Sequence, residues 1–335
     1  MKIAITGGAG FIGSNVVRQA LRNKYNVLNI DALTYAGNIA NLKNLENKDY
    51  HKFTKTNILN FKKVLFILEN FKPNYLMHLA ASSHVDNSII GPKEFIKTNI
   101  EGTFTLLEAI RELIKKSKLP KNFKFHYIST DEVYGSLDKY GSFEEDDKLN
   151  PLNPYSATKA SAQHLVKSWG NTYDIPYIIS NCSNNYGPYQ HPEKLIPKTI
   201  INALNKRNIP VYGNGKNIRD WLHVSDHAEC LLHIASKGKV SEIYNIGANN
   251  EYSNIFIVKK ICKILDKKIK PKKSFLNLLK FVKDRPGHDF RYSINPTKIN
   301  HELLWYPKIS FNDGLLSTIN WYAENKKWWK KYIKE

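Results

Sequence analysis

Short apolar runs alternate with amphipathic stretches along the first half of the chain. The runs at 2–6, 26–30, 51–57, 75–80 and 123–128 are too short for helices and rich in β-branched and aromatic residues, which predicts buried strands. Helical periodicity follows at 14–23, 61–71 and 96–116. Repeated strand–helix units predict an α/β fold built on a doubly wound parallel sheet.

The alternation continues after residue 150 with shorter strands. Strands are predicted at 177–182, 209–212 and 243–246, and helices at 194–204, 225–236 and 254–265. We expect residues 328–331, Trp-Trp-Lys-Lys, to be a fraying helix end, although this mixture also suits an interface. The pattern predicts a smaller C-terminal α/β lobe beside the main sheet.

A glycine-rich turn, Gly7-x-x-Gly10-x-x-Gly13, joins the first strand to its helix, and Asp31 ends the second strand. This order is typical of a Rossmann-type dinucleotide-binding unit, although the commoner glycine spacing is G-x-G-x-x-G. Glycines let the backbone approach a pyrophosphate at the positive helix N-terminus. Asp31 would accept hydrogen bonds from the adenosine ribose and repel a 2′-phosphate, which favours NAD over NADP.

The fifth apolar run leads into Thr130, Asp131 and Glu132. Adjacent carboxylates at the carboxyl end of a strand can act as acid and base if the pocket separates their pKa values. Thr and Asp are also common in solvated turns, so this stretch alone leaves both interpretations open.

Pro154 can start a helix, which places Tyr155 and Lys159 four residues apart on one face. A phenol has a pKa near 10 in water, and a nearby ammonium with a nicotinamide ring would lower it. Tyr155 could then take a hydroxyl proton while NAD takes a hydride. An isolated pair of this kind is usually a surface feature, but the dinucleotide unit favours the catalytic interpretation.

Composition limits the functional classes. The chain has 335 residues and a formal net charge of +20, and only seven of its 50 basic residues are Arg. The dispersed Lys residues predict solvated surfaces rather than a specific nucleic-acid site. No apolar run approaches the roughly 20 residues that span a bilayer. Cys182, Cys230 and Cys262 have neither disulfide nor metal-ligand spacing, so we expect no metal site and a cytoplasmic location.

These motifs together resemble the extended short-chain dehydrogenase/reductase superfamily, and the stretch 130–135, Thr-Asp-Glu-Val-Tyr-Gly, resembles its nucleotide-sugar 4,6-dehydratases. The resemblance extends through 33–38, 77–81, 83–86, 181–189, 192–197, 218–221 and 284–289, and so covers nearly the whole chain. It implies C4 oxidation, loss of water across C5 and C6, and hydride return to C6. The catalytic residues that it implies are Thr130, Asp131, Glu132, Tyr155 and Lys159.

The resemblance also implies residues that bind NAD and substrate. The expected NAD-binding residues are Gly7, Gly10, Phe11, Ile12, Gly13, Asp31, Ala32, Leu33, Thr34, Asn57, Ile58, Leu79, Ala80, Ala81, Ser83, Thr98, Tyr155, Lys159 and Asn185. The expected substrate-binding residues are Ser83, Thr130, Asn184, Lys194, Leu195, Pro210, Tyr212, Arg219, Asn245, Arg285 and His288.

The implied substrate is dTDP-glucose, with UDP-glucose as the alternative. The alternative from another functional class is a noncatalytic protein of the same fold that binds NAD or nucleic acid. Three positions depart from the common family pattern: Ser82 replaces Glu, Asn87 replaces Arg, and Asn57 replaces Asp. We interpret these changes as lineage variation.

We predict a Rossmann domain at 1–183 and 221–247, and a nucleotide-sugar-binding lobe at 184–220 and 248–335. The substrate would lie in the cleft between them. Superfamily members usually pair through two helices each, and we expect a homodimer formed by the helices at 96–116 and 155–173. No specific nucleic acid or membrane partner is expected.

Overall fold

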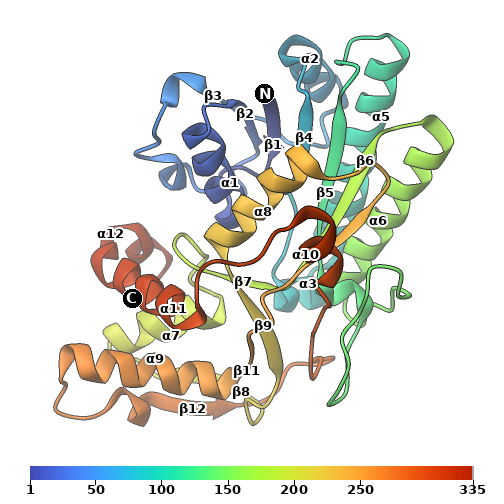
Figure 1. The fold of residues 1–335 in the computed structure, drawn as a ribbon. Coiled ribbons are helices and arrows are strands. Elements are labelled where there is room, and N and C mark those ends of the chain that lie inside the picture. Colours follow the sequence, from blue (N-terminus) through green and yellow to red (C-terminus); the bar gives the residue numbers. More distant parts are fainter. Residues whose placement is uncertain (334–335) are drawn as a thin grey trace.

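A seven-stranded sheet forms the larger part of the protein, whose computed structural model describes residues 1–333 (Figure 1). Its strand order is β10-β6-β5-β4-β1-β2-β3, and every pairing is parallel. The strands are β1 (Lys2–Thr6), β2 (Asn26–Asp31), β3 (His51–Lys55), β4 (Tyr75–His78), β5 (Lys124–Thr130), β6 (Tyr177–Cys182) and β10 (Ile243–Ile246). The expected doubly wound parallel sheet is confirmed.

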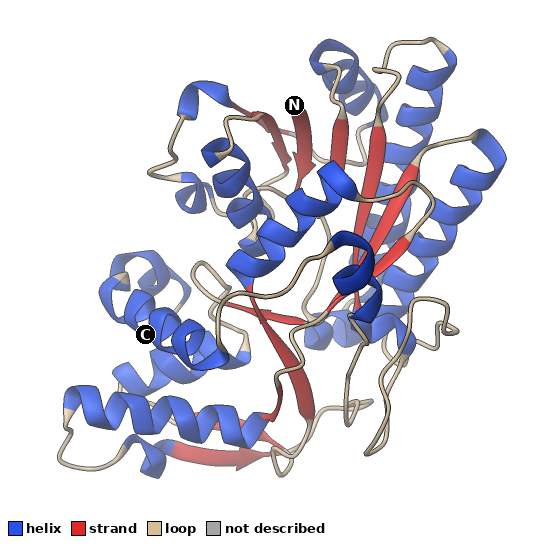
Figure 2. Cartoon of the chain, viewed as in Figure 1, coloured by secondary structure: helices blue, strands red, loops and turns tan. Residues whose placement is uncertain are grey.

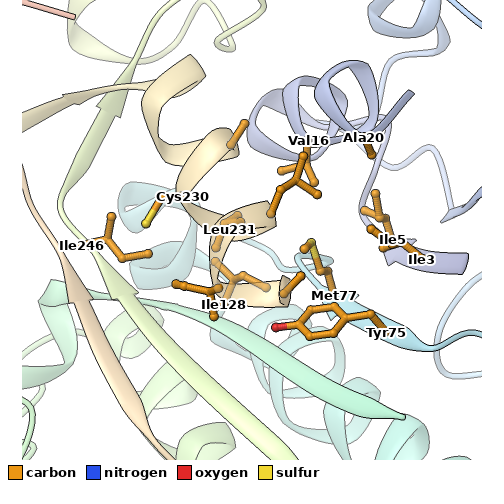
Figure 3. Packing of buried hydrophobic residues seen from close by; sticks show 14 of the residues in the cluster. Ile3, Ile5, Val16, Ala20, Tyr75, Met77, Ile128, Cys230, Leu231 and Ile246 are labelled. Atoms are coloured by element: carbon orange, nitrogen blue, oxygen red, sulfur yellow. The ribbon is translucent and has the colours of Figure 1, made fainter. Parts of the chain in front are cut away.

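Helices cover both faces of this sheet (Figure 2). The helices are α1 (Phe11–Arg22) and α8 (Val224–Lys237) on one face, and α2 (Phe61–Phe71), α5 (Gly102–Lys115) and α6 (Pro154–Tyr173) on the other. Figure 3 shows Val16 of α1 and Leu231 of α8 packed over Ile5 and Met77 of the strands. Burial on both faces explains why the strands are continuous apolar runs.

The smaller lobe contains two short sheets. One has the order β11-β9-β7 and the other pairs β12 with β8. Helices α7, α9 and α11 share a separate apolar core with them. The elements are β7 (Asn184–Tyr186), α7 (Leu195–Leu204), β8 (Ile209–Tyr212), β9 (Ile218–His223), β11 (Glu251–Ser253), α9 (Asn254–Ile269), β12 (Leu279–Val282) and α11 (Phe311–Glu324).

The domain boundaries stay a prediction. Helix α10 (Thr297–Leu303) falls in the range assigned to the lobe, yet Ile299, Leu303 and the following Trp305 pack into the core beneath the large sheet. The remaining helices are short: α3 (Val85–Ile90), α4 (Pro92–Phe95) and α12 (Lys326–Trp329). Within residues 1–333, none of the helices has the length and apolar character needed to cross a bilayer.

The predicted helix at 96–116 is not one regular α-helix. Residues Ile96–Glu101 form a π-helical segment, and regular α-helix begins at Gly102. In this segment Asn99 accepts a hydrogen bond from the Ser82 backbone at 2.8 Å and donates to Thr158 Oγ1 of α6 at 2.9 Å. The wider turn thus links the loop after β4 to helix α6, a tertiary contact that helical periodicity does not predict.

The other differences lie at the ends of elements. Strand β5 continues through Thr130, and Asp131–Tyr134 form a 3₁₀ turn directly after it. The C-terminal segment ends in α12 and a 3₁₀ turn, Lys330–Tyr332, and Trp329 is 3% exposed. The expected fraying end is therefore wrong for residues 328–331, because Trp329 packs in the core of the lobe.

Candidate functional site

A cavity of about 300 Å³ lies at the carboxyl ends of the parallel strands. This edge is where open α/β sheets bind their ligands. Most of the predicted site residues line it: Gly7, Gly10, Phe11, Ile12, Gly13, Asp31, Ala32, Thr34, Asn57, Ile58, Leu79, Ala80, Ala81, Ser83, Thr98, Thr130, Asp131, Glu132, Tyr155, Lys159, Asn184, Asn185 and Lys194.

The glycine turn has no room for side chains at two of its positions. A Cβ atom on Gly13 would lie 2.2 Å from the Gly7 carbonyl oxygen. Gly7 has a φ of +74°, and a Cβ there would lie 2.7 Å from the Ala80 nitrogen. The turn therefore packs closely against the loop after β4 and exposes backbone at the N-terminus of α1. This geometry fits a dinucleotide pyrophosphate.

Asp31 is fixed by two backbone donors. Its Oδ2 atom accepts from Ala9 N at 2.8 Å and its Oδ1 atom accepts from Leu33 N at 2.7 Å. Burial raises the pKa of the carboxyl, and the two backbone donors oppose this effect. Leu33 has a φ of 55° and reaches this site through its backbone. The arrangement holds a carboxylate at the position where the adenosine ribose of NAD would bind.

Thr130, Asp131 and Glu132 lie together where β5 ends. Thr130 Oγ1 is 3.2 Å from Asp131 Oδ1, and Asn153 donates to Glu132 Oε2 at 3.3 Å. Burial raises the pKa of Asp131 well above its usual value, and the neighbouring Glu132 raises it further. Within residues 1–333, Asp131 Oδ2 is buried without a hydrogen-bond partner. The site therefore favours a protonated Asp131 beside a second carboxyl group, as the division into acid and base requires.

Tyr155 and Lys159 both line the cavity, and the lowering of the phenol pKa expected from the ammonium together with the nicotinamide ring stays a prediction. Burial raises the pKa of Tyr155 well above 10, and Glu132 adds to the rise. Lys159 donates to the Ile128 carbonyl at 2.7 Å and lies 4.2 Å from the centre of the Tyr127 ring. Burial lowers the pKa of Lys159 to about 7, so its charge is itself weakened.

The region after β6 supplies three further lining residues. Lys194 donates to the Ser83 carbonyl at 3.1 Å, which joins the lobe to the loop after β4. Asn185 donates to the Ser183 carbonyl at 2.9 Å and contacts His227 through its Oδ1 atom at 2.8 Å. These contacts hold Asn185 and Lys194 in place beside the cavity. Asn184 lies next to them on β7.

Some predicted substrate residues lie outside the cavity wall. They are Leu195, Pro210, Tyr212, Arg219, Asn245, Arg285 and His288. Tyr212 and Arg285 meet at Asp86 of α3, with distances of 3.1 Å and 3.4 Å to its two oxygens. His288 Nδ1 lies 2.6 Å from Asp284 Oδ1. Asp86 thus connects helix α3 to two predicted substrate residues of the lobe.

Arg219 and Asn245 differ in what they can offer a ligand. Arg219 donates to the carbonyls of Ile218 and Asp289 at 2.7 Å and 3.0 Å. These partners are neutral carbonyls, and the guanidinium also lies 4.2 Å from the centre of the Tyr292 ring. Asn245 is fully buried and accepts from Tyr134 at 2.9 Å while donating to the Phe143 carbonyl at 3.1 Å. This network gives Asn245 a structural role within the sheet.

The sequence did not predict several lining residues. Among them are Tyr35, Asn41, Tyr189, Gln190, His191, Glu193, Trp328 and Tyr332. Glu193 lies 3.5 Å from His191 and 3.7 Å from His84, and burial lowers the pKa of both imidazoles to about 4. Glu193 belongs to a stretch quoted for the resemblance, 192–197, which could have indicated it, whereas His191 lies between two such stretches. Nothing in the local pattern could have indicated Trp328 or Tyr332.

The three departures from the family pattern have different surroundings. Ser82 is buried, and its backbone bonds to Asn99 through both N–H and C=O. Asn87 donates its backbone N–H to the His84 ring at 3.3 Å. Asn57 lines the cavity and caps its own turn by accepting from Leu59 N. Among the described residues, no group of three or more His, Cys, Asp or Glu side chains could hold a metal ion.

Comparisons with known proteins agree with this geometry. Residues 4–318 match the family model described as GDP-mannose 4,6 dehydratase. The chain is 49% identical to a dTDP-glucose 4,6-dehydratase of Escherichia coli, over 99% of this chain and 96% of the relative. It matches the Bacillus anthracis dTDP-glucose 4,6-dehydratase, solved in complex with NAD, with a TM-score of 0.87 and 42% identity over 99% and 100% of the two chains. The chain also matches the dTDP-glucose 4,6-dehydratase of Streptomyces venezuelae, solved with NAD and dTDP bound. The TM-score is 0.91 and the sequence identity is 39%, over 99% of this chain and 100% of that chain.

Proposed function

Because this chain belongs to the family of dTDP-glucose 4,6-dehydratases, we propose that it converts dTDP-glucose to dTDP-4-keto-6-deoxyglucose and water. It is an NAD-dependent hydro-lyase. The observation that carries the proposal is the raised pKa of Asp131 beside Glu132, at the same cavity as Tyr155. A simple C4 dehydrogenase or epimerase has no step that uses this acid–base pair.

The first step uses Tyr155 as the base. NAD, when bound, accepts the hydride from C4 of the sugar and later gives it back at C6. Tyr155 takes the proton of the C4 hydroxyl, and Thr130 would hydrogen-bond the same oxygen. Burial raises the pKa of Tyr155, and the positive nicotinamide ring of bound NAD would oppose that rise.

The second step uses the two carboxyl groups. The C4 ketone acidifies the proton on C5, and Glu132 removes it. Asp131 gives its proton to the C6 hydroxyl, which leaves as water. A proton then returns to C5 as the hydride returns to C6, so that the cycle ends with no net oxidation. The buried, protonated Asp131 is suited to this donation because burial disfavours its charged form.

The anionic diphosphate of the substrate needs cationic partners. We propose that Arg219 and Arg285 bind it, because a guanidinium offers a bidentate fork to phosphate oxygens. Arg285 lies 3.4 Å from Asp86 Oδ1. On substrate binding it would leave this carboxylate and bind the diphosphate. Lys194 and Asn184 would contact the sugar end from the cavity wall. Leu195, Pro210, Tyr212 and His288 remain proposed contacts to the nucleotide.

Purified protein incubated with dTDP-glucose and, separately, with UDP-glucose tests the proposal. We expect the 4-keto-6-deoxy product from dTDP-glucose, detected by mass spectrometry as loss of one water from the sugar. Faster turnover of UDP-glucose would select the alternative substrate. Intact NAD binding with no product from either sugar nucleotide would instead favour a noncatalytic NAD-binding protein.

We further propose a homodimer and a cytoplasmic location. Phe104 of α5 and Ile96 are 45% and 46% exposed, and Phe104 contacts Trp169 of α6 with ring centres 5.8 Å apart. An apolar surface shared by two helices suits a paired helix interface. Sedimentation of a Phe104→Glu variant tests it, since a monomer is expected. The reducing cytoplasm suits three buried free cysteines.

A further inference from the structure

Two aromatic residues from the C-terminal segment reach the cofactor side of the cavity. Trp328 and Tyr332 line the same cavity as Asp31, Thr34 and Gly37, although nearly 300 positions separate them along the chain. Their rings lie 5.6 Å apart. Because the resemblance that identifies the cofactor site includes neither residue, their position is a separate observation.

Both residues bond to the loop at 34–41, which forms part of the cavity wall. Trp328 Nε1 donates to Asn41 Oδ1 at 2.8 Å. Asn38 Nδ2 donates to the Tyr332 hydroxyl at 2.9 Å. Two side-chain hydrogen bonds therefore hold this loop from the C-terminal segment.

The loop in turn bonds to the glycine turn. The Ala9 carbonyl accepts from Asn38 N at 3.0 Å and from Asn41 Nδ2 at 2.9 Å. Two consecutive hydrogen bonds therefore connect Trp328, through the side-chain amide of Asn41, to the backbone of Ala9 in the glycine turn. Since the glycine turn forms the pyrophosphate site, the C-terminal segment orients the backbone that would hold the cofactor.

Further contacts fix the segment and the loop on their outer sides. Tyr332 packs against His191, with ring centres 4.8 Å apart, and Trp328 packs against Tyr189 at 5.9 Å. Arg18 of α1 lies over the Tyr189 ring at 4.8 Å and donates to the Asn41 carbonyl at 2.6 Å. Helix α1 and the C-terminal segment thus both contact the same loop.

From these contacts we propose that Trp328 and Tyr332 form a C-terminal latch that keeps the loop at 34–41 closed over bound NAD. The inference rests on the proposed function, because a cycle that regenerates NAD has no need to release it. Neither residue touches the reacting atoms; both are positioning residues that act through Asn38 and Asn41. Release of NAD requires the loop to leave the glycine turn, and the latch opposes that movement.

The test uses Trp328→Phe and Tyr332→Phe, singly and together, in the full chain loaded with NAD. Each change removes one hydrogen-bonding group and keeps a ring. The controls are Tyr306→Phe and Tyr140→Phe, which change exposed residues; neither residue lines the cavity. The readout is the rate at which NAD dissociates into excess competing cofactor analogue, with no sugar nucleotide present.

We expect the double variant to release NAD roughly tenfold faster, equivalent to about 1.4 kcal/mol, and the controls to match the wild type. The rise in melting temperature caused by NAD should shrink in the double variant, while the melting temperature without NAD stays at the control value. Unchanged release from a folded double variant would overturn the latch. An equal fall in melting temperature with and without NAD would also overturn it, because it marks a purely structural role.

The same experiment separates this inference from the proposed function. A wild type that holds NAD and converts dTDP-glucose, with variants that release NAD no faster, would overturn the latch alone. A wild type that neither holds NAD nor forms product would overturn the proposed function and the latch with it.

Discussion

Lys159 donates a hydrogen bond to the carbonyl oxygen of Ile128 at 2.7 Å. The bond ties helix α6 to strand β5 two residues before Thr130, and so fixes the spacing between Tyr155 and the two carboxyl groups. Its strength depends on the charge of a buried ammonium whose pKa is lowered to about 7 by burial. Lys159, which we propose to be catalytic, therefore also helps to align its neighbours.

Lys159→Met should change the pH dependence of stability. In the wild type the pKa falls from 10.5 in the unfolded chain to about 7 in the folded protein. Between these values the unfolded chain binds the extra proton, so this residue makes stability rise with pH, by about 1.4 kcal/mol per pH unit. Urea titrations across this range should show a flatter profile for the variant, together with strongly reduced turnover. An unchanged profile would contradict the lowered pKa.

Asp131→Asn should weaken catalysis and strengthen the fold. Removing a general acid is expected to slow formation of product roughly a hundredfold or more. The raised pKa means that the folded protein holds a proton which the unfolded chain loses, so wild-type stability falls as pH rises above the ordinary Asp range. The variant should therefore melt at a higher temperature at neutral pH. A lower melting temperature would argue against a buried, protonated Asp131.

Glu132→Gln should separate oxidation from loss of water. The amide can still accept from Asn153, so the turn after β5 should keep its shape. We expect reduced cofactor to accumulate on mixing with dTDP-glucose while the 4-keto-6-deoxy product forms far more slowly. Asp138→Asn, at an exposed position, is the control. Wild-type product formation by Glu132→Gln would show that another group removes the C5 proton.

Gly13→Ala should abolish NAD retention. The new Cβ would lie 2.2 Å from the Gly7 carbonyl oxygen, so the glycine turn must open to accept it. Overpacking of this kind is expected to destabilise the fold by roughly 1–3 kcal/mol. Gly91→Ala is the matched control, because its Cβ would approach nothing nearer than 3.8 Å. NAD content after gel filtration measures the effect, and equal NAD content in the two variants would contradict it.

The sequence predicted the large sheet better than the lobe. Strands such as β1 and β4 are buried on both faces, so each leaves a continuous apolar run that can be recognised locally. Strands β7 and β11 have three residues each, and β12 has four; all exist through pairing with distant segments. The π-helical turn at Ile96–Glu101 likewise depends on the contact of Asn99 with Ser82 and Thr158.

The candidate site followed a similar division. Motif spacing located the glycine turn, Asp31 and the 130–132 stretch, because each lies at the end of a local strand. Spacing also placed Tyr155 and Lys159 on one helix, but it could not show that Lys159 bonds to Ile128. The lowered pKa of Lys159 and the raised pKa of Tyr155 arise from burial among residues of several elements.

The sequence alone determined the fold class and the preference for NAD through local periodicity and side-chain chemistry, and the resemblance to the family implied the residues proposed for the dehydration. Only the tertiary structure decided which groups have shifted pKa values and which distant residues share the cavity. Burial raises the pKa of Asp131, and the packing of the lobe brings Trp328 and Tyr332 to the loop at 34–41. Neither effect has a local signal, since both arise from contacts between residues far apart in the chain.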